Sequence, residues 1–213
     1  MEDILLVGMP HENPEIINGD HIAKELACGK LFSNCEWIFH ESVGSTNDLV
    51  RQRLRTNADQ KIIVVCARRQ TSGRGRGMNR WVSNRVNNIY LSFGFPTKIG
   101  SVPQFSQIFA NKVVRCFRDV FSVNLTVKAP NDLLLGDRKV GGILLEVPAK
   151  ICGWILGIGI NLFSDPDLQG QCAQPVGAID LVKNLQPDAV ILELCTIVAN
   201  LKEEMGKKFS IKM

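Results

Sequence analysis

The chain has 213 residues, of which 45% are hydrophobic and 22% are charged, and this size and composition are typical of one globular domain with a sizeable core. Its 25 Lys and Arg residues exceed its 21 Asp and Glu residues by four, which is too weak an excess to indicate a nucleic-acid or anionic membrane partner. No apolar run approaches the roughly 20 residues of a membrane-spanning helix, and the acidic start lacks the pattern of a secretory signal. We therefore expect a cytoplasmic protein that binds neither nucleic acid nor membranes.

Seven cysteines are spread along the chain without a CxxC pair, which argues against a disulfide framework or a cysteine-rich zinc site. Most of them, Cys172 excepted, lie in apolar runs where a free cysteine behaves as a small buried hydrophobe. His11, His21 and His40 are too far apart to form a closely spaced ligand pair. We expect no metal site built from dedicated protein ligands, so that any metal arrives with a substrate.

The first half of the chain predicts a succession of strands and one capped helix. Residues 1–36 contain a polar turn and a short helix near 22–28, and we assign them no function. The elements expected next are a strand at 37–41, a helix capped by Ser45 or Thr46 with Leu49, Val50 and Leu54 on one face, a strand at 61–69, a polar loop rich in glycine and arginine, and a strand at 88–95.

The second half predicts two long helices with strands between them. Residues 103–121 place apolar side chains at intervals of three and four after a leading proline, which indicates an amphipathic helix. Apolar runs separated by short turns follow at 125–129, 139–147 and 153–162, and a last helix begins at Pro187. Closely spaced turns favour antiparallel neighbours. The sequence therefore predicts an α+β fold in which helices pack on a mixed, largely antiparallel β-sheet.

The loop at 73–77, GRGRG, joins two of the expected strands. It opens no helix, so it is neither a P-loop nor a dinucleotide fingerprint. Its glycines let the backbone approach a ligand closely, and Arg74 and Arg76 can clamp phosphate or carboxylate oxygens. Without an anion between them the two cations repel each other, and we expect the empty loop to be mobile. Taken alone, a solvated basic hairpin explains the loop equally well.

Two further clusters place polar side chains between strands. Pro130, Asn131 and Asp132 form a turn sequence, and Lys139 precedes the paired glycines 141 and 142. A lysine in that position can be held near an anionic group while the glycines let backbone N–H groups approach the same ligand. An ordinary turn and an ordinary solvated charge pair are the competing interpretations.

The motifs occur in a specific joint order. In chain order they are Ser45-Thr46-Asn47, Gln70, Gly73-Arg74-Gly75-Arg76, Asn79, Trp81, Lys128-x-Pro130-Asn131-Asp132, Arg138-Lys139-Val140-Gly141-Gly142-Ile143-Leu144 and Gly157-Ile158-Gly159-Ile160-Asn161. This set, which covers the chain from about Phe39 to Asn161, resembles the catalytic domain of biotin protein ligases.

The resemblance implies a class II aminoacyl-tRNA-synthetase-like biotin ligase catalytic domain over 37–213, preceded by an N-terminal segment of unknown role over 1–36. Many members of the family also carry a C-terminal β-barrel domain, and the repressor subtype a DNA-binding domain; we expect neither in this chain. It also implies two reactions: biotin and ATP, with Mg²⁺ carried by ATP, form biotinyl-5′-AMP, and a specific lysine of a biotin carboxyl carrier domain then displaces AMP. The carrier domain of a biotin-dependent carboxylase is the expected partner, and a homodimer is compatible with the resemblance.

The resemblance also assigns roles to individual residues. The catalytic residues are Lys139, Asp132, Arg76 and Arg74; the biotin-binding residues are Ser45, Thr46, Gln70, Gly73, Lys139 and Gly142; and the ATP- or adenylate-binding residues are Arg74, Arg76, Trp81, Asn131, Lys139 and Asn161. Lys139 would contact both the biotin carboxylate and the α-phosphate, the arginine loop would cover the adenylate, and Asp132 would orient or deprotonate the acceptor lysine.

Two residues depart from the family pattern, and two alternatives stay open. Ala129 stands where the family usually has Trp, and Met78 where many members have Gly. One alternative is an octanoyl or lipoyl transferase in which Cys172, eleven residues after Asn161, is the nucleophile paired with Lys139. The other is a non-catalytic biotin-binding module. The arginine loop favours adenylation, because the substrate of a transferase arrives already activated as a thioester.

Overall fold

The computed structural model of the chain describes residues 17–28, 35–56, 61–83, 86, 88–96, 103–151, 153–165, 174–179 and 185–210. Its elements are, in order, α1 (Gly19–Cys28), β1 (Cys35–His40), α2 (Thr46–Arg55), β2 (Ile62–Ala67), β3 (Ile89–Phe95), α3 (Pro103–Phe121), β4 (Thr126–Lys128), β5 (Asp132–Leu135), β6 (Arg138–Glu146), β7 (Trp154–Ile160) and α4 (Pro187–Ser210). Among the helices described, none combines the length and the apolar character needed to cross a bilayer.

Seven strands form one sheet in the order β1-β2-β3-β7-β6-β5-β4. β1 pairs with β2 in parallel, and each of the other neighbouring pairs is antiparallel. The central pairing joins β3 to β7, with Ile89 opposite Ile160. The predicted α+β fold with a mixed, largely antiparallel sheet is confirmed.

Most of the elements lie where the sequence places them, and α3 has the bounds that its apolar spacing predicts. β5 is the exception, because three leucines between two turns are too short a run to be recognised as a strand. The structure also places Asp132 at the start of β5, directly after the turn, where it pairs with Gly142 of β6. This residue therefore has a position fixed by the sheet.

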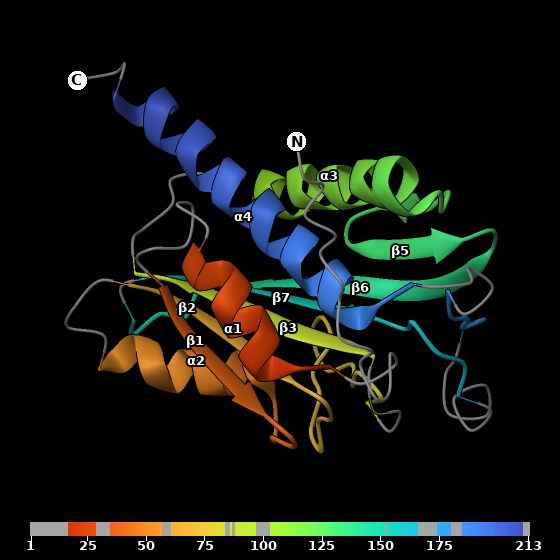
Figure 1. Cartoon of the computed structure of the whole chain (residues 1–213), viewed down its shortest axis with the longest axis horizontal. Helices are drawn as coiled ribbons and strands as arrows, with labels where there is room; N and C mark the ends of the chain where they lie inside the picture. The colour runs from red at the N-terminus through yellow and green to blue at the C-terminus, as the bar shows by residue number, and fades with distance from the viewer. Residues whose placement is uncertain are drawn as a thin grey trace, which may run out of the picture.

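The two faces of the sheet are covered differently (Figure 1). α1, α3 and α4 lie over one face, and α2 packs on the other face against β2, β3 and β7. On β2 the alternation of side chains separates the two cores: Ile62 and Val64 face the three helices, whereas Ile63 and Val65 face α2. α2 is short and leaves part of its face of the sheet free for a site.

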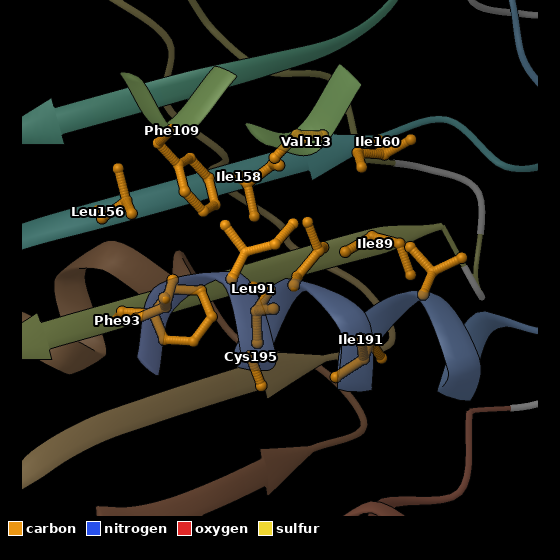
Figure 2. Packing of buried hydrophobic residues seen from close by; sticks show 14 of the residues in the cluster. Ile89, Leu91, Phe93, Phe109, Val113, Leu156, Ile158, Ile160, Ile191 and Cys195 are labelled. Atoms are coloured by element: carbon orange, nitrogen blue, oxygen red, sulfur yellow. The ribbon is translucent and has the colours of Figure 1, made fainter. Parts of the chain in front are cut away.

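The larger core lies between the sheet and the three helices. Figure 2 shows its centre, where Ile89, Leu91 and Phe93 of β3 and Leu156, Ile158 and Ile160 of β7 meet Phe109 and Val113 of α3 and Ile191 and Cys195 of α4. The segment before β1 contributes to the same core through the buried Ile17 and Ile22. The expected domain boundary at residue 36 stays a prediction.

Replacing Phe109 with Ala is expected to lower the free energy of unfolding by about 3–5 kcal/mol, because the fully buried ring leaves a cavity between α3 and the sheet. Denaturant titration followed by circular dichroism measures this loss. Val120→Ala on the same helix is the matched control, since Val120 is 54% exposed and its truncation should change little. Equal effects of the two substitutions would contradict this account of the core.

Candidate active site

A cavity of about 940 Å³ opens on the face of the sheet that carries α2. All twelve site residues expected from the sequence line it: Ser45, Thr46, Gln70, Gly73, Arg74, Arg76, Trp81, Asn131, Asp132, Lys139, Gly142 and Asn161. They come from the start of α2 and the residue before it, from the segment between β2 and β3, from β5 and the turn before it, from β6, and from the residue after β7. The structure therefore brings the expected residues together, while their individual roles stay predictions.

The part of the cavity floor that lies under Trp81 is glycine backbone. Gly142 of β6 pairs with Gly159 of β7, and Trp81 lies against both. A β-carbon at Gly159 would lie 2.6 Å from Cε2 of Trp81, and one at Gly142 would lie 3.2 Å from its Cζ3. Only glycine at this pair lets the indole approach the sheet so closely.

A β-bulge aims Lys139 into the cavity. The register between β5 and β6 shifts between Leu133 and Leu134, and Val140 has no partner across this pair. Without the extra residue, Lys139 and Gly142 would face opposite sides of the sheet, because side chains alternate along a strand. With the bulge both face the cavity, and a β-carbon at Gly142 would lie 3.6 Å from Cε of Lys139.

Lys139 and Asp132 form an ion pair inside the cavity. Nζ of Lys139 lies 2.7 Å from Oδ1 of Asp132, and the two side chains are only 19% and 17% exposed. The ammonium also lies 5.6 Å from the centre of a Trp81 ring, within the range of a cation–π contact. The site thus holds a cation and a carboxylate in contact, both accessible to a ligand from the cavity.

One side of the cavity is a hydrogen-bonded row of Gln70, Thr46, Ser92 and Asn47, which we call the polar wall. Oε1 of Gln70 accepts from the N–H of Thr46 at 2.8 Å and lies 3.1 Å from its Oγ1. Oγ of Ser92 lies 2.7 Å from Oγ1 of Thr46 and 2.6 Å from Oδ1 of Asn47. Nε2 of Gln70 donates to Ser83 at 3.1 Å, which fixes the orientation of that amide.

The side-chain oxygens of the polar wall have fewer protons than contacts between them. Nδ2 of Asn47 donates to Oε2 of Glu146 at 2.7 Å, and because a carboxylate only accepts, the amide oxygen of Asn47 must face Ser92. The row then ends in an amide oxygen on each side, and its three oxygen–oxygen contacts share two hydroxyl protons. One of the three contacts therefore lacks a proton, so an oxygen of the wall is available to accept from a ligand N–H.

Ser45 adds a hydroxyl beside the wall. It is the N-cap residue of α2, with extended backbone, but its side chain makes no capping hydrogen bond. The prediction that Ser45 or Thr46 caps this helix is confirmed for the position of Ser45, but not for a capping bond from its side chain. Ser45 is among the residues that line the cavity.

The arginine-containing loop is a tight hairpin. Arg74 and Arg80 form an antiparallel bridge, and the N–H of Gly75 donates to the carbonyl of Asn79 at 2.8 Å. Gly77 turns the chain with a φ of 65°, a conformation that favours glycine. Met78, which departs from the family pattern, is 98% exposed in this turn, so it does not obstruct the cavity.

Arg74 has carboxylate partners without any ligand. Its Nη1 and Nη2 donate to Oε1 and Oε2 of Glu146, both at 3.0 Å, and Nη2 lies 2.8 Å from Oδ1 of Asp48. The expectation that both arginines lack an anionic partner in the empty loop is therefore wrong for Arg74. Arg76 is exposed, and its side chain makes no ion pair or hydrogen bond with the residues described.

The two asparagines expected at the nucleotide use their amide nitrogens within the fold. Nδ2 of Asn131 donates to the carbonyl of Ile143 at 2.9 Å, and Nδ2 of Asn161 donates to the carbonyl of Gly177 at 3.0 Å. Both side chains still line the cavity. Ala129, the other departure from the family pattern, is exposed in the turn before β5 and is not among the lining residues.

Sequence reasoning missed Asn47, Ser92 and Glu146 as site residues. Asn47 stands in a motif that was recognised, so its position next to Thr46 was an available signal. Ser92 is the polar residue of an otherwise apolar strand and is fully buried, which is a second available signal. Glu146 ends β6 and carries no local pattern that indicates its partner in the hairpin.

The cysteines bear on the alternative of a thiol nucleophile. Cys172 lies outside the described residues. Of the cysteines that are described, none lines the cavity. Burial raises the pKa of the Cys66 and Cys195 thiols, and burial together with Glu193 raises the pKa of Cys116 to about 12. The described part of the chain also contains no group of three His, Cys, Asp or Glu side chains suited to a metal ion.

Residues 39–161 match a family model described as the biotin/lipoate A/B protein ligase family. The bifunctional ligase/repressor BirA of Bacillus subtilis is 32% identical over 135 residues, which are 61% of this chain and 41% of that protein. The biotin–protein ligase of Homo sapiens is 27% identical over 93% of this chain and 28% of that protein. The chain thus spans less than half the length of these two curated relatives.

Two solved structures extend the comparison to the fold. The biotin protein ligase of Leishmania major in complex with biotinyl-5-AMP has a TM-score of 0.66 and 25% identity, covering 83% of this chain and 76% of that one. The Aquifex aeolicus biotin protein ligase in complex with biotin and ATP has a TM-score of 0.65 and 25% identity, covering 81% of this chain and 72% of that one. The fold is that of biotin ligase catalytic domains, as the sequence resemblance implies.

Replacing Gly159 with Ala is expected to force Trp81 off the floor of the cavity, because the new methyl group would lie within 3 Å of the indole. The hairpin should loosen with it, since the N–H of Trp81 donates to the carbonyl of Gly73. Amide hydrogen exchange across 73–81 should increase by about tenfold or more, as expected when a packed contact is overfilled. Gly44→Ala is the control, because a β-carbon there meets no atom within 4 Å. Unchanged exchange in Gly159→Ala would contradict the close packing of Trp81.

Proposed function

Because the chain belongs to the biotin/lipoate A/B protein ligase family, we propose that it carries out the two reactions of a biotin–protein ligase. In the first, biotin and ATP form biotinyl-5′-AMP and pyrophosphate; in the second, a lysine of a biotin carboxyl carrier domain displaces AMP. The observation that carries the proposal is that Lys139, Arg76 and the polar wall line one cavity. A carboxylate, a phosphate and a cyclic urea can be bound there side by side.

The polar wall is suited to the ureido ring of biotin. This ring offers two N–H donors and one carbonyl oxygen. The acceptor surplus of the wall takes an N–H, and the hydroxyl of Ser45 is available to the same ring. Gly73, whose β-carbon would collide with Ser83 and with the backbone of Trp81, keeps this end of the cavity narrow.

The first reaction brings two anions together, and cations in the cavity reduce their repulsion. A carboxylate oxygen of biotin bonds to the α-phosphorus of ATP, and the bond from that phosphorus to pyrophosphate breaks with its electron pair on pyrophosphate. Lys139 contacts both the carboxylate and the phosphate, and exchanges Asp132 for these new partners. Arg76, which has no protein partner among the described residues, supplies the second positive charge.

The second reaction uses the carboxylate that Lys139 has released. The acceptor amine bonds to the carbonyl carbon of the mixed anhydride, and the bond to AMP breaks with its electron pair on the phosphate oxygen. Asp132, at the start of β5, orients the amine and takes its proton. Lys139 and Asp132 thereby act in successive steps from the same ion pair.

The nucleotide is assigned to the side of the cavity that holds Trp81, Asn131 and Asn161. Trp81 offers an aromatic wall for adenine. Asp132 is the one described carboxylate that lines the cavity, and it pairs with Lys139; Glu146 and Asp48, beside the hairpin, pair with Arg74. We therefore assign no protein ligand to Mg²⁺ and expect it to enter on the ATP phosphates. The carrier partner is the carboxylase domain expected from the sequence; the cytoplasmic location and a homodimer stay predictions.

One experiment separates this proposal from its alternatives. The protein is incubated with ATP, Mg²⁺ and either biotin, lipoate or octanoate, and the acyl-adenylates are separated by chromatography. Biotinyl-5′-AMP alone is the expected product. Adenylation of lipoate or octanoate alone would overturn the proposal, and loss of activity in Cys172→Ser would favour a thiol nucleophile. Absence of any adenylate would favour a binding module.

Lys139→Ala is expected to slow adenylate formation by at least about 10²-fold, the scale for loss of one preorganised electrostatic group. Biotin-dependent pyrophosphate release measures the first reaction. Lys112→Ala is the matched control, because Lys112 also forms an ion pair, with Glu204, but lies between α3 and α4 away from the cavity. Near-normal pyrophosphate release in Lys139→Ala would show that this lysine does not act in adenylation.

Asp132→Asn is expected to separate the two reactions. Adenylate should accumulate, because Lys139 keeps its charge and loses only a competing partner. Labelling of the carrier domain should fall by about 10²-fold, which is the lower end of what one general base contributes. A single turnover with labelled biotin follows both products at once. If the two reactions decline equally, Asp132 belongs to nucleotide binding or to the structure of β5.

A further inference from the structure

Glu146, the last residue of β6, accepts hydrogen bonds from three residues in two other segments of the site, α2 and the hairpin. Nδ2 of Asn47 donates at 2.7 Å, Nη2 of Arg51 at 2.9 Å, and both terminal nitrogens of Arg74 at 3.0 Å. The side chain is 19% exposed. Parallel bonds from one guanidinium to one carboxylate are the most directional ion pair that proteins form.

The pairing balances charge around the hairpin. Arg51 and Arg74 share Glu146 and Asp48, so two cations face two carboxylates. Arg74 therefore has little free charge to offer an anionic ligand, whereas Arg76, two residues further on, keeps its own. The two arginines thus differ in their carboxylate partners, although they lie two residues apart in the same glycine-rich loop.

Glu146 also terminates the polar wall. Its bond to Asn47 fixes the orientation of that amide, and the amide oxygen then faces Ser92. The carboxylate thus binds the hairpin through both of its oxygens and the polar wall through Oε2. Among the described residues, Glu146 is the one side chain that hydrogen-bonds both Arg74 and the polar wall.

We propose that Glu146 is a positioning residue that acts through Arg74: it holds the hairpin 73–81 against β6 so that Arg76 meets the phosphate of the adenylate and the hairpin retains it. This inference rests on the proposed function, because it concerns the loop that covers the same ligand. Arg74 is the anchor of the loop, and Arg76 is its contact to the anion. Loss of the anchor lets the hairpin open and release the adenylate before the carrier arrives.

The test compares Glu146→Gln, Arg74→Gln and the double variant. Glu146→Gln preserves shape but turns an N–H₂ group toward donors of Arg74, Arg51 or Asn47. Arg74→Gln removes the other partner of the same ion pair. Because the Arg74 side chain is half-exposed, this variant still tests the inference if Glu146→Gln folds poorly. Glu36→Gln is the matched control, since Glu36 pairs with Arg53 of α2 outside the cavity.

Two quantities are measured. The first is amide hydrogen exchange across 71–81 in the ligand-free protein, which does not depend on any reaction. The second is the rate at which preformed biotinyl-5′-AMP dissociates. Each single variant should raise both by about tenfold, and the double variant should add little, because both substitutions break one shared interaction. Glu36→Gln should leave both unchanged.

The outcomes distinguish this inference from the proposed function. Additive effects of the two substitutions, or faster exchange spread over the whole domain, would assign Glu146 to general stability and overturn the inference. Unchanged exchange across 71–81 in Glu146→Gln would overturn it as well. If the wild-type protein neither forms nor binds biotinyl-5′-AMP, the proposed function fails, and the role of Glu146 as the adenylate-retaining anchor fails with it, even where exchange shows that it holds the hairpin.

Discussion

The site depends on the close packing of Trp81 and Asn47 against glycines of the sheet. Trp81 lies on the glycine pair of β6 and β7, and Asn47 lies so close to Gly157 that a β-carbon there would be 2.3 Å from its amide oxygen. The first contact seats the hairpin and the second seats the start of α2. The glycines of β6 and β7 therefore fix the positions of both walls of the cavity and of the functional groups on these walls.

Most of the charged side chains of the site are held in ion pairs. Lys139 is bound to Asp132 and Arg74 to Glu146, and the first of these pairs is largely shielded from solvent. Breaking such a pair without a replacement partner is costly, because an unpaired charge would be left in a weakly hydrated place. An anionic ligand supplies the replacement for Lys139. An anionic ligand must therefore compete with Asp132 for Lys139.

Much of this arrangement follows from the sequence, for identifiable reasons. The bounds of α3 follow from a spacing that only a helix satisfies, and Lys139, Gln70 and Thr46 belong to motifs whose order is specific. The bulge at Val140 and the existence of β5 are properties of strand pairing, which local pattern does not contain.

The partnership of Arg74 with Glu146 was not predictable for the same reason. The two residues are 72 positions apart, and nothing near either one indicates the other. A motif identifies which residues belong to a site, but the distribution of charge among them depends on contacts made by the fold. Two arginines in one short motif therefore acquired different surroundings.

The position of β7 between β3 and β6 has a consequence for folding during synthesis on the ribosome. β4, β5, β6 and β7 are joined by short turns and can pair soon after synthesis, whereas β3 is made early and lacks this neighbour until β7 emerges. Gly159 belongs to β7, so a nascent chain that ends before it has no floor for a ligand. A ligand that needs this floor can therefore stabilise only chains that extend past Gly159.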